Sequence, residues 1–173
     1  MILDLARLLV FPALIAFAAS SDIFSMRISN RVSLMLAAGF LVLAVASGMA
    51  PTDILMHLAA GAVVLVVAFG CFAMNWIGGA DAKIAAAAGL WFGFGLLMPY
   101  LLYASIFGGA LTILLIQFRQ WPLPYVFVGQ SWLLRLHAGE SGVPYGIALA
   151  VGALAIYPET NWVKAVDLAH FAL

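Results

Sequence analysis

Two aspartates are the residues of this chain whose positions could support chemistry. Asp81 stands in the stretch Ile-Gly-Gly-Ala-Asp-Ala-Lys at residues 77–83, with apolar sequence on both sides, and Asp22 closes the first apolar run. A carboxylate at membrane depth costs about 2.5–3.5 kcal/mol even on lenient insertion scales, so such an acid usually has a partner or a function. We therefore predict that Asp22 and Asp81 form a pair.

A pair of carboxylates held close together can hydrolyse a peptide bond. Because the two cannot both ionise cheaply, one keeps a proton while the other is charged, and they titrate as a unit. The charged carboxylate can take a proton from water while the neutral one polarises a carbonyl group, as in aspartic proteases. This chemistry needs no metal or cofactor, and we expect neither, since the chain has one cysteine, Cys71, and no metal-ligand spacing.

Four residues near the aspartates could assist. Gly78 and Gly79 have no side chains, so we expect a substrate backbone to approach Asp81 closely. Lys83 is predicted to anchor the chain at the membrane boundary, where its charge could hold one aspartate ionised. Asn30 is expected to hold the segment after Asp22 through hydrogen bonds to backbone, with a direct substrate role as the alternative.

Composition sets the class of protein. Of the 173 residues, 66% are hydrophobic and only 8% are charged. A soluble domain with that balance could not cover its surface with polar groups, so the chain is predicted to cross a membrane several times. No polar stretch is long enough for a separate soluble domain, so we expect residues 1–173 to form a single membrane-embedded domain. The net charge is zero, and nothing suggests a nucleic-acid partner.

The prediction is an all-α protein with six transmembrane helices and short interfacial helices. A run without charge, residues 84–117, is long enough for two helices, and Pro99 near its middle predicts the break. One span followed by a re-entrant segment is the alternative. Gly89 and Gly93 have the spacing that lets helices approach closely. The predicted spans are residues 2–21, 32–50, 54–76, 82–98, 99–118 and 143–157, and the interfacial helices lie at 132–137 and beyond Glu159.

Topology follows from the basic residues. With six spans, five lysines and arginines fall on one side of the membrane and two fall on the other. The richer side is predicted to be cytoplasmic, and both Asp22 and Asp81 lie on it. The richer set is Arg27, Arg31, Lys83, Arg119 and Arg135, and the poorer set is Arg7 and Lys164.

Three stretches carry a resemblance to a known family. Asp22 is followed after five residues by Ile-Ser-Asn, residues 78–83 read Gly-Gly-Ala-Asp-Ala-Lys, and residues 143–148 read Val-Pro-Tyr-Gly-Ile-Ala. Their order and spacing resemble the type IV prepilin peptidases, membrane aspartic proteases of the GxGD class. Two residues depart from the family pattern, because Ser29 stands where the family usually has proline and Ala80 where it usually has the second glycine.

The resemblance implies roles for individual residues. Asp22 and Asp81 would be the catalytic dyad, and the substrate would be a prepilin or pseudopilin precursor whose short basic leader is cut after a glycine in the cytoplasm. Its apolar helix would lie in the membrane. The residues that we expect to line the substrate site are Gly78, Gly79, Ala80, Lys83, Asn30 and Pro144.

The resemblance also implies a cellular context. The chain has no counterpart of the cysteine-containing zinc-binding insertion that accompanies N-methylation in longer members, so it resembles the short forms that cleave only. Residues 132–137 leading into 143–146 are especially like the peptidases of Flp, or tight-adherence, pili. The expected location is the bacterial inner membrane, with the lipid bilayer and the pilus assembly machinery as partners and the active site facing the cytoplasm.

Other interpretations remain open from the sequence. The same two acids could bind a cation or relay protons in a small transporter or channel subunit. The chain could also be an inactive assembly protein that keeps the fold. Asp22 alone could be a polar helix end, and Asp81 alone could stabilise a helix N-terminus by about 0.3–1 kcal/mol.

Overall fold

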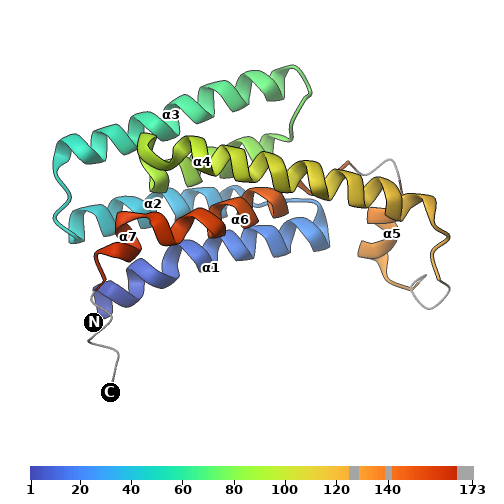
Figure 1. Ribbon diagram of the computed structural model, residues 1–173, viewed down its shortest axis with the longest axis horizontal. Helices are drawn as coiled ribbons and strands as arrows, with labels where there is room; N and C mark the ends of the chain where they lie inside the picture. Colours follow the sequence, from blue (N-terminus) through green and yellow to red (C-terminus); the bar gives the residue numbers. More distant parts are fainter. Residues whose placement is uncertain (125–128, 139–141, 167–173) are drawn as a thin grey trace.

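The computed structural model describes residues 1–124, 129–138 and 142–166. Within these ranges the predicted all-α class is confirmed, with seven α-helices and one short 3-10 helix (Figure 1). The predicted interfacial helix at 132–137 corresponds to α5, and α7 lies within the predicted tail helix, of which residues 167–173 lie outside the described residues. The elements are α1 (Ile2–Ser25), α2 (Asn30–Ala46), α3 (Pro51–Ala73), α4 (Gly79–Gln120), α5 (Ser131–His137), α6 (Tyr145–Ile156), η2 (Tyr157–Glu159) and α7 (Asn161–Lys164).

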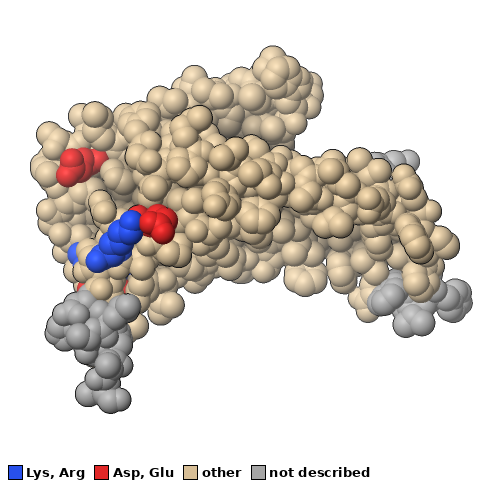
Figure 2. Space-filling view, in the orientation of Figure 1, with Lys and Arg blue, Asp and Glu red and all other residues tan. Residues whose placement is uncertain are grey.

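The outside of the helix bundle is suited to lipid. Helices α1, α3 and α4 are long and apolar enough to cross a membrane, and α2 is a shorter apolar helix. Large apolar side chains such as Phe17, Val66 and Ile106 are exposed on these helices, and the face in Figure 2 shows acidic and basic residues only towards one end. The chain is therefore a multi-pass membrane protein. That the chain crosses the membrane six times stays a prediction.

Helix α4 contains a break that the sequence analysis put at the wrong residue. The backbone leaves helical geometry at Gly93, with φ 57° and ψ −177°, and the chain folds back there (Figure 1). Pro99, predicted to mark the break, lies inside the second segment, residues 94–120. Glycine is required at the break because only glycine adopts this backbone conformation readily. A Cβ atom at Gly93 would also lie 2.9 Å from the ring of His57.

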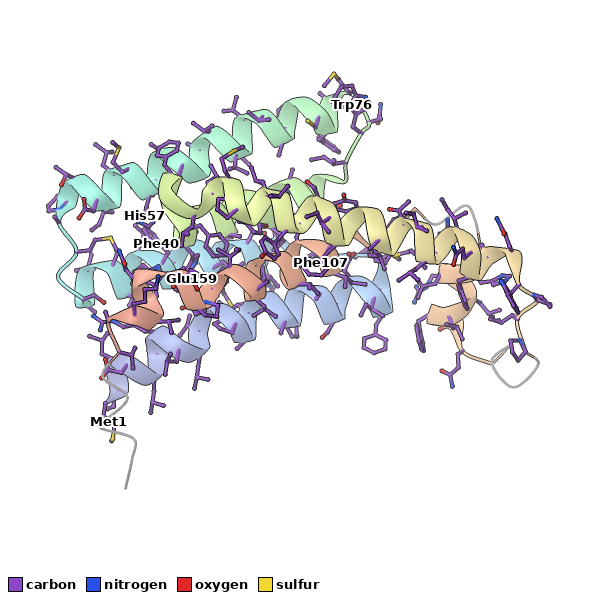
Figure 3. The ribbon with its side chains drawn as sticks, in the orientation of Figure 1. Met1, Phe40, His57, Trp76, Phe107 and Glu159 are labelled. Atoms are coloured by element: carbon purple, nitrogen blue, oxygen red, sulfur yellow. The ribbon has the colours of Figure 1, made fainter. Side chains whose placement is uncertain are left out.

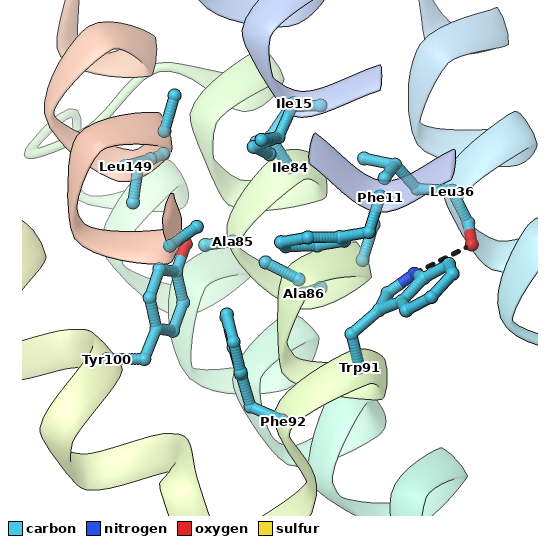
Figure 4. Packing of buried hydrophobic residues seen from close by; sticks show 14 of the residues in the cluster. Phe11, Ile15, Leu36, Ile84, Ala85, Ala86, Trp91, Phe92, Tyr100 and Leu149 are labelled. Atoms are coloured by element: carbon cyan, nitrogen blue, oxygen red, sulfur yellow. Dashed lines mark hydrogen bonds between the residues drawn. The ribbon is translucent and has the colours of Figure 1, made fainter. Parts of the chain in front are cut away.

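Side chains from other helices satisfy the carbonyl groups that the break leaves free. The Nδ1 atom of His57 donates to the carbonyl oxygen of Leu90 at 2.6 Å, and Nε1 of Trp162 donates to that of Trp91 at 3.0 Å. The indole of Trp91 in turn donates to the carbonyl oxygen of Leu36 at 3.0 Å (Figure 4). A helix end buried without such partners would be strongly unfavourable, so these contacts stabilise the turn at Gly93.

The first segment of α4, residues 79–92, lies inside the bundle. Small residues let its neighbours approach closely, as predicted for Gly89, whose missing Cβ would lie 3.6 Å from the Cα atom of Gly61 on α3. Figure 3 shows Met1, His57 and Glu159 towards one end of the bundle and Trp76 at the other. The start of α4 and the end of α1 belong to the end marked by Trp76, so the two aspartates share that end (Figure 1).

Candidate active site

Asp22 lies within a helix and is buried. The first apolar run was predicted to end at residue 21, but α1 continues to Ser25 and ends at Met26, whose φ of 52° is left-handed. Asp22 therefore projects from the last turn of α1 and is only 6% exposed. The interpretation of Asp22 as a helix end satisfied by water does not fit a side chain so deeply buried.

The N-terminus of α6 supplies the hydrogen-bond partner of Asp22. The backbone N–H of Gly146 donates to Oδ2 of Asp22 at 2.8 Å. Pro144, the residue before α6, provides no side-chain cap, and the first N–H groups of a helix need an outside acceptor. The positive end of the helix dipole also favours a negative charge there, by about 0.3–1 kcal/mol. Asp22 thus caps α6 from a distant part of the chain.

Asp81 lies in the first turn of α4 and is half-buried. The residue before that helix is Gly78, and a Cβ atom there would lie 2.8 Å from Oδ2 of Asp81. A Cβ atom at Gly79 would lie 3.2 Å from the ring of Phe72. The missing side chain of Gly78 therefore makes room for the carboxylate of Asp81 itself, and that of Gly79 makes room for Phe72.

The structure brings the two aspartates together. The two carboxyl groups lie near enough for their charges to interact. Among the described residues neither aspartate forms an ion pair with a lysine or arginine. Each is instead placed at a helix N-terminus, Asp22 at that of α6 and Asp81 at that of α4. Two neighbouring carboxylates, neither of them paired with a cation, are the arrangement in which one proton is shared.

Lys83 and Asn30 form a contact with each other. The ammonium group of Lys83 donates to Oδ1 of Asn30 at 2.9 Å, on an exposed surface. Lys83 therefore links α4 to α2, and it forms no ion pair with any aspartate that the structure describes. Both residues line a groove of about 450 Å³ between α2, α3 and α4, whose remaining lining is apolar or small apart from Ser33. The groove begins at Asn30 and Lys83 and continues along the bundle towards Leu90. Lys83 follows Asp81 by two residues, and neither aspartate lines the groove.

The structure describes the surroundings of Ser29 and Ala80, the two residues that depart from the family motifs. Ser29 is the N-cap of α2, and its hydroxyl accepts a hydrogen bond from the backbone N–H of Arg31. Ala80 is partly buried against the apolar core. The turn after Asp22 is also held by serines, since the hydroxyls of Ser21 and Ser25 both donate to the carbonyl oxygen of Arg27.

Helix α5 packs beside the end of α1. The ring of Trp132 makes an edge contact with Phe24, with centroids 5.7 Å apart, and the guanidinium of Arg135 donates to the carbonyl oxygen of Phe24. Phe24 follows Asp22 by two residues. Helix α5 therefore covers the polypeptide next to one aspartate.

The fold and the site define an all-helical, multi-pass membrane protein with two aspartates together at one end of its bundle. The sequence profile of the type IV leader peptidase family matches residues 9–113, more than half of the chain, including Asp22 and Asp81. The chain belongs to this family, and it is an aspartic peptidase of the kind that processes prepilins. No curated protein and no solved structure matches it.

Two residues that the sequence analysis did not single out belong to this region. Gly146, the hydrogen-bond donor to Asp22, lies in the stretch 143–148 that was noted as a whole, but only Pro144 was named from it. Tyr100 is the other, and it lies 19 positions after Asp81 in a segment predicted to begin a new span. The sequence alone did not indicate that Tyr100 lies near Asp81, because that position depends on the turn at Gly93.

Proposed function

We propose that the protein removes the leader peptide of Flp-type prepilins at the cytoplasmic face of the bacterial inner membrane, with Asp22 and Asp81 as the catalytic pair. The observation that carries this proposal is the placement of two distant aspartates at one end of the bundle, each at a helix N-terminus, in a chain of the type IV leader peptidase family. The Flp-type substrate is supported by the resemblance in residues 132–137 and 143–146.

The contacts of the two aspartates indicate which one acts as the general base and which as the general acid. Asp22 accepts a hydrogen bond from Gly146, which favours its charged form, so we assign it the role of general base. Asp81 is the more exposed of the two and carries the shared proton. Asp22 takes a proton from water, the resulting hydroxide adds to the scissile carbonyl carbon, and Asp81 gives its proton to the carbonyl oxygen. The tetrahedral intermediate then collapses: the amide nitrogen takes a proton from Asp22, one hydroxyl of the intermediate returns a proton to Asp81, and the carbon–nitrogen bond breaks to give the acid and the amine.

The groove that begins at Lys83 and Asn30 fits the apolar segment of such a substrate. Its floor includes Gly61, Ala86 and Ala87, and small residues let a second helix approach closely within a membrane. In this arrangement the leader emerges beside the aspartates, and the substrate passes Gly78, Gly79 and Ala80 at the start of α4. Pro144 contributes by fixing the start of α6.

The cytoplasmic orientation is supported by the basic residues at the end that holds the aspartates. It can be tested by labelling with a membrane-impermeant thiol reagent in a Cys71→Ser background. We expect Glu159→Cys to be labelled from outside intact cells and Ser131→Cys to be labelled only after the cells are opened. The reverse pattern would contradict the orientation.

The activity is tested by co-expressing the protein with an Flp-type precursor and following the size of the precursor. We expect a smaller product whose new N-terminus, determined by sequencing, follows a glycine. The control is Asp53→Asn, which changes an exposed acid at the opposite end of the bundle and should process the precursor normally. Ion flux in proteoliposomes without any cleavage would favour the transporter alternative instead.

A further inference from the structure

Tyr100 is the one residue, in the part of the chain that the structure describes, with a fully buried side-chain oxygen or nitrogen that has no hydrogen-bond partner. The residue is 0% exposed, and its ring packs at 4.8 Å between centroids against Phe92. A buried hydroxyl without a partner costs about 1–3 kcal/mol, and such groups in native proteins call for an explanation.

The hydroxyl group of Tyr100 points towards the face of α4 that carries Asp81. Figure 4 shows the ring directed at Ala85 and Leu149. Ala85 follows Asp81 by four positions, so the two share one face of the helix, a single turn apart. Asp81 is also near enough for its charge to act on the hydroxyl.

The connection between Tyr100 and Asp81 passes through the turn at Gly93. Asp81 belongs to the first segment of α4 and Tyr100 to the second, and the left-handed glycine between them is the point where the two segments change direction. The separation of the hydroxyl and the carboxylate therefore depends on the geometry of this turn.

We propose that the hydroxyl of Tyr100 donates a hydrogen bond to the carboxyl group of Asp81, directly or through one water molecule, when a peptide is bound. Tyr100 is thus a positioning residue of the reaction, which orients Asp81 towards the scissile carbonyl. This inference rests on the proposed function.

The test is Tyr100→Phe, which keeps the ring and removes only the hydroxyl. We expect kcat for precursor cleavage to fall about tenfold with KM within about twofold of wild type, because Tyr100 orients Asp81 for the reaction and does not itself hold the peptide. The melting temperature in detergent should be unchanged or higher, since an unsatisfied buried group is removed. The matched control is Tyr103→Phe on the same helix segment, where the side chain is 42% exposed, and wild-type kinetics are expected.

A purely structural role predicts different results. If kcat of Tyr100→Phe stays within twofold of wild type, or if it falls only together with the melting temperature, the inference is wrong. The variants Asp22→Asn and Asp81→Asn test the proposed function independently of the role of Tyr100. Loss of cleavage in those two variants with normal cleavage by Tyr100→Phe would keep the peptidase proposal and overturn the role of Tyr100. Absence of cleavage by the wild-type protein would overturn both.

Discussion

The backbone N–H of Gly146 donates a hydrogen bond to Oδ2 of Asp22 at 2.8 Å, although the two residues lie 124 positions apart. This contact joins the last turn of α1 to the first turn of α6. A free N–H group at a helix N-terminus needs an acceptor, and a buried carboxylate needs a donor. The hydrogen bond between Gly146 and Asp22 satisfies both groups. The position of Asp22 therefore depends on where α6 begins.

Gly146→Ala should displace Asp22. The added Cβ atom would lie 2.7 Å from Oδ2 of Asp22 and 2.9 Å from Cδ1 of Ile28, so the carboxylate or the helix must shift. A misplacement of about 1 Å can reduce a rate about 100-fold, and we expect a loss of about 10- to 100-fold in kcat/KM for precursor cleavage. The control is Gly70→Ala on α3, where no atom lies within 4 Å of the new Cβ and wild-type activity is expected. Equal activity of the two variants would contradict the role given to Gly146.

Gly93→Ala should destabilise the turn in α4. Its φ of 57° with an extended ψ is costly for alanine, by about 1–3 kcal/mol, and the ring of His57 occupies the space that a Cβ atom needs. Thermal unfolding in detergent should show a lower melting temperature for this variant. Gly95→Ala, two residues away with no atom within 4 Å of the new Cβ, should be neutral or slightly stabilising. A Gly93→Ala protein as stable as wild type would show that the turn at this residue is not needed.

Lys83→Gln should weaken substrate binding without slowing the chemical step. Lys83 is exposed and bonded to Asn30, so its loss should change the free energy of unfolding by less than about 1 kcal/mol. Because it lies at the start of the groove, we expect KM to rise about threefold or more with kcat nearly constant. Lys164→Gln, which removes an exposed ion pair with Glu159 at the other end of the molecule, should change neither constant. A fall in kcat with constant KM would place Lys83 in the reaction itself.

The pH dependence of kcat/KM should be bell-shaped. As the pH falls, the second carboxylate of the pair gains a proton and no base remains. As the pH rises, the shared proton is lost and no acid remains. Cleavage should therefore be lost on both sides of an optimum, and Asp53→Asn should give the same curve. A rate that rises with pH to a plateau, with no decline, would contradict a shared proton.

The sequence was sufficient to predict the all-α membrane class and that Asp22 and Asp81 would share one end of the bundle. Apolar run lengths and the alternation of connections fix these features, whatever the details of packing. The end of α1 was predicted four residues too early, because the serines around Asp22 read as polar sequence. In the structure their hydroxyls instead bond to backbone carbonyl oxygens.

The turn in α4 and the partner of Asp22 could not be predicted, since both depend on contacts between distant segments. Pro99 was the stronger local signal for a break, but a proline is tolerated within a membrane helix and lies inside the second segment. Gly93 was noted for its spacing from Gly89, and its left-handed backbone is stabilised by His57 and Trp162, which come from other helices. The donor role of Gly146 likewise required the position of α6.

The central claim is that Asp22 and Asp81 together perform the hydrolysis. The most direct measurement is the rate of precursor cleavage by purified Asp22→Asn and Asp81→Asn, each compared with Asp53→Asn at equal protein concentration and equal thermal stability. We predict that each of the first two variants loses about 100- to 10,000-fold in rate, the range for removal of a general acid or base, while Asp53→Asn keeps the wild-type rate. Normal cleavage by either Asp22→Asn or Asp81→Asn would contradict the account.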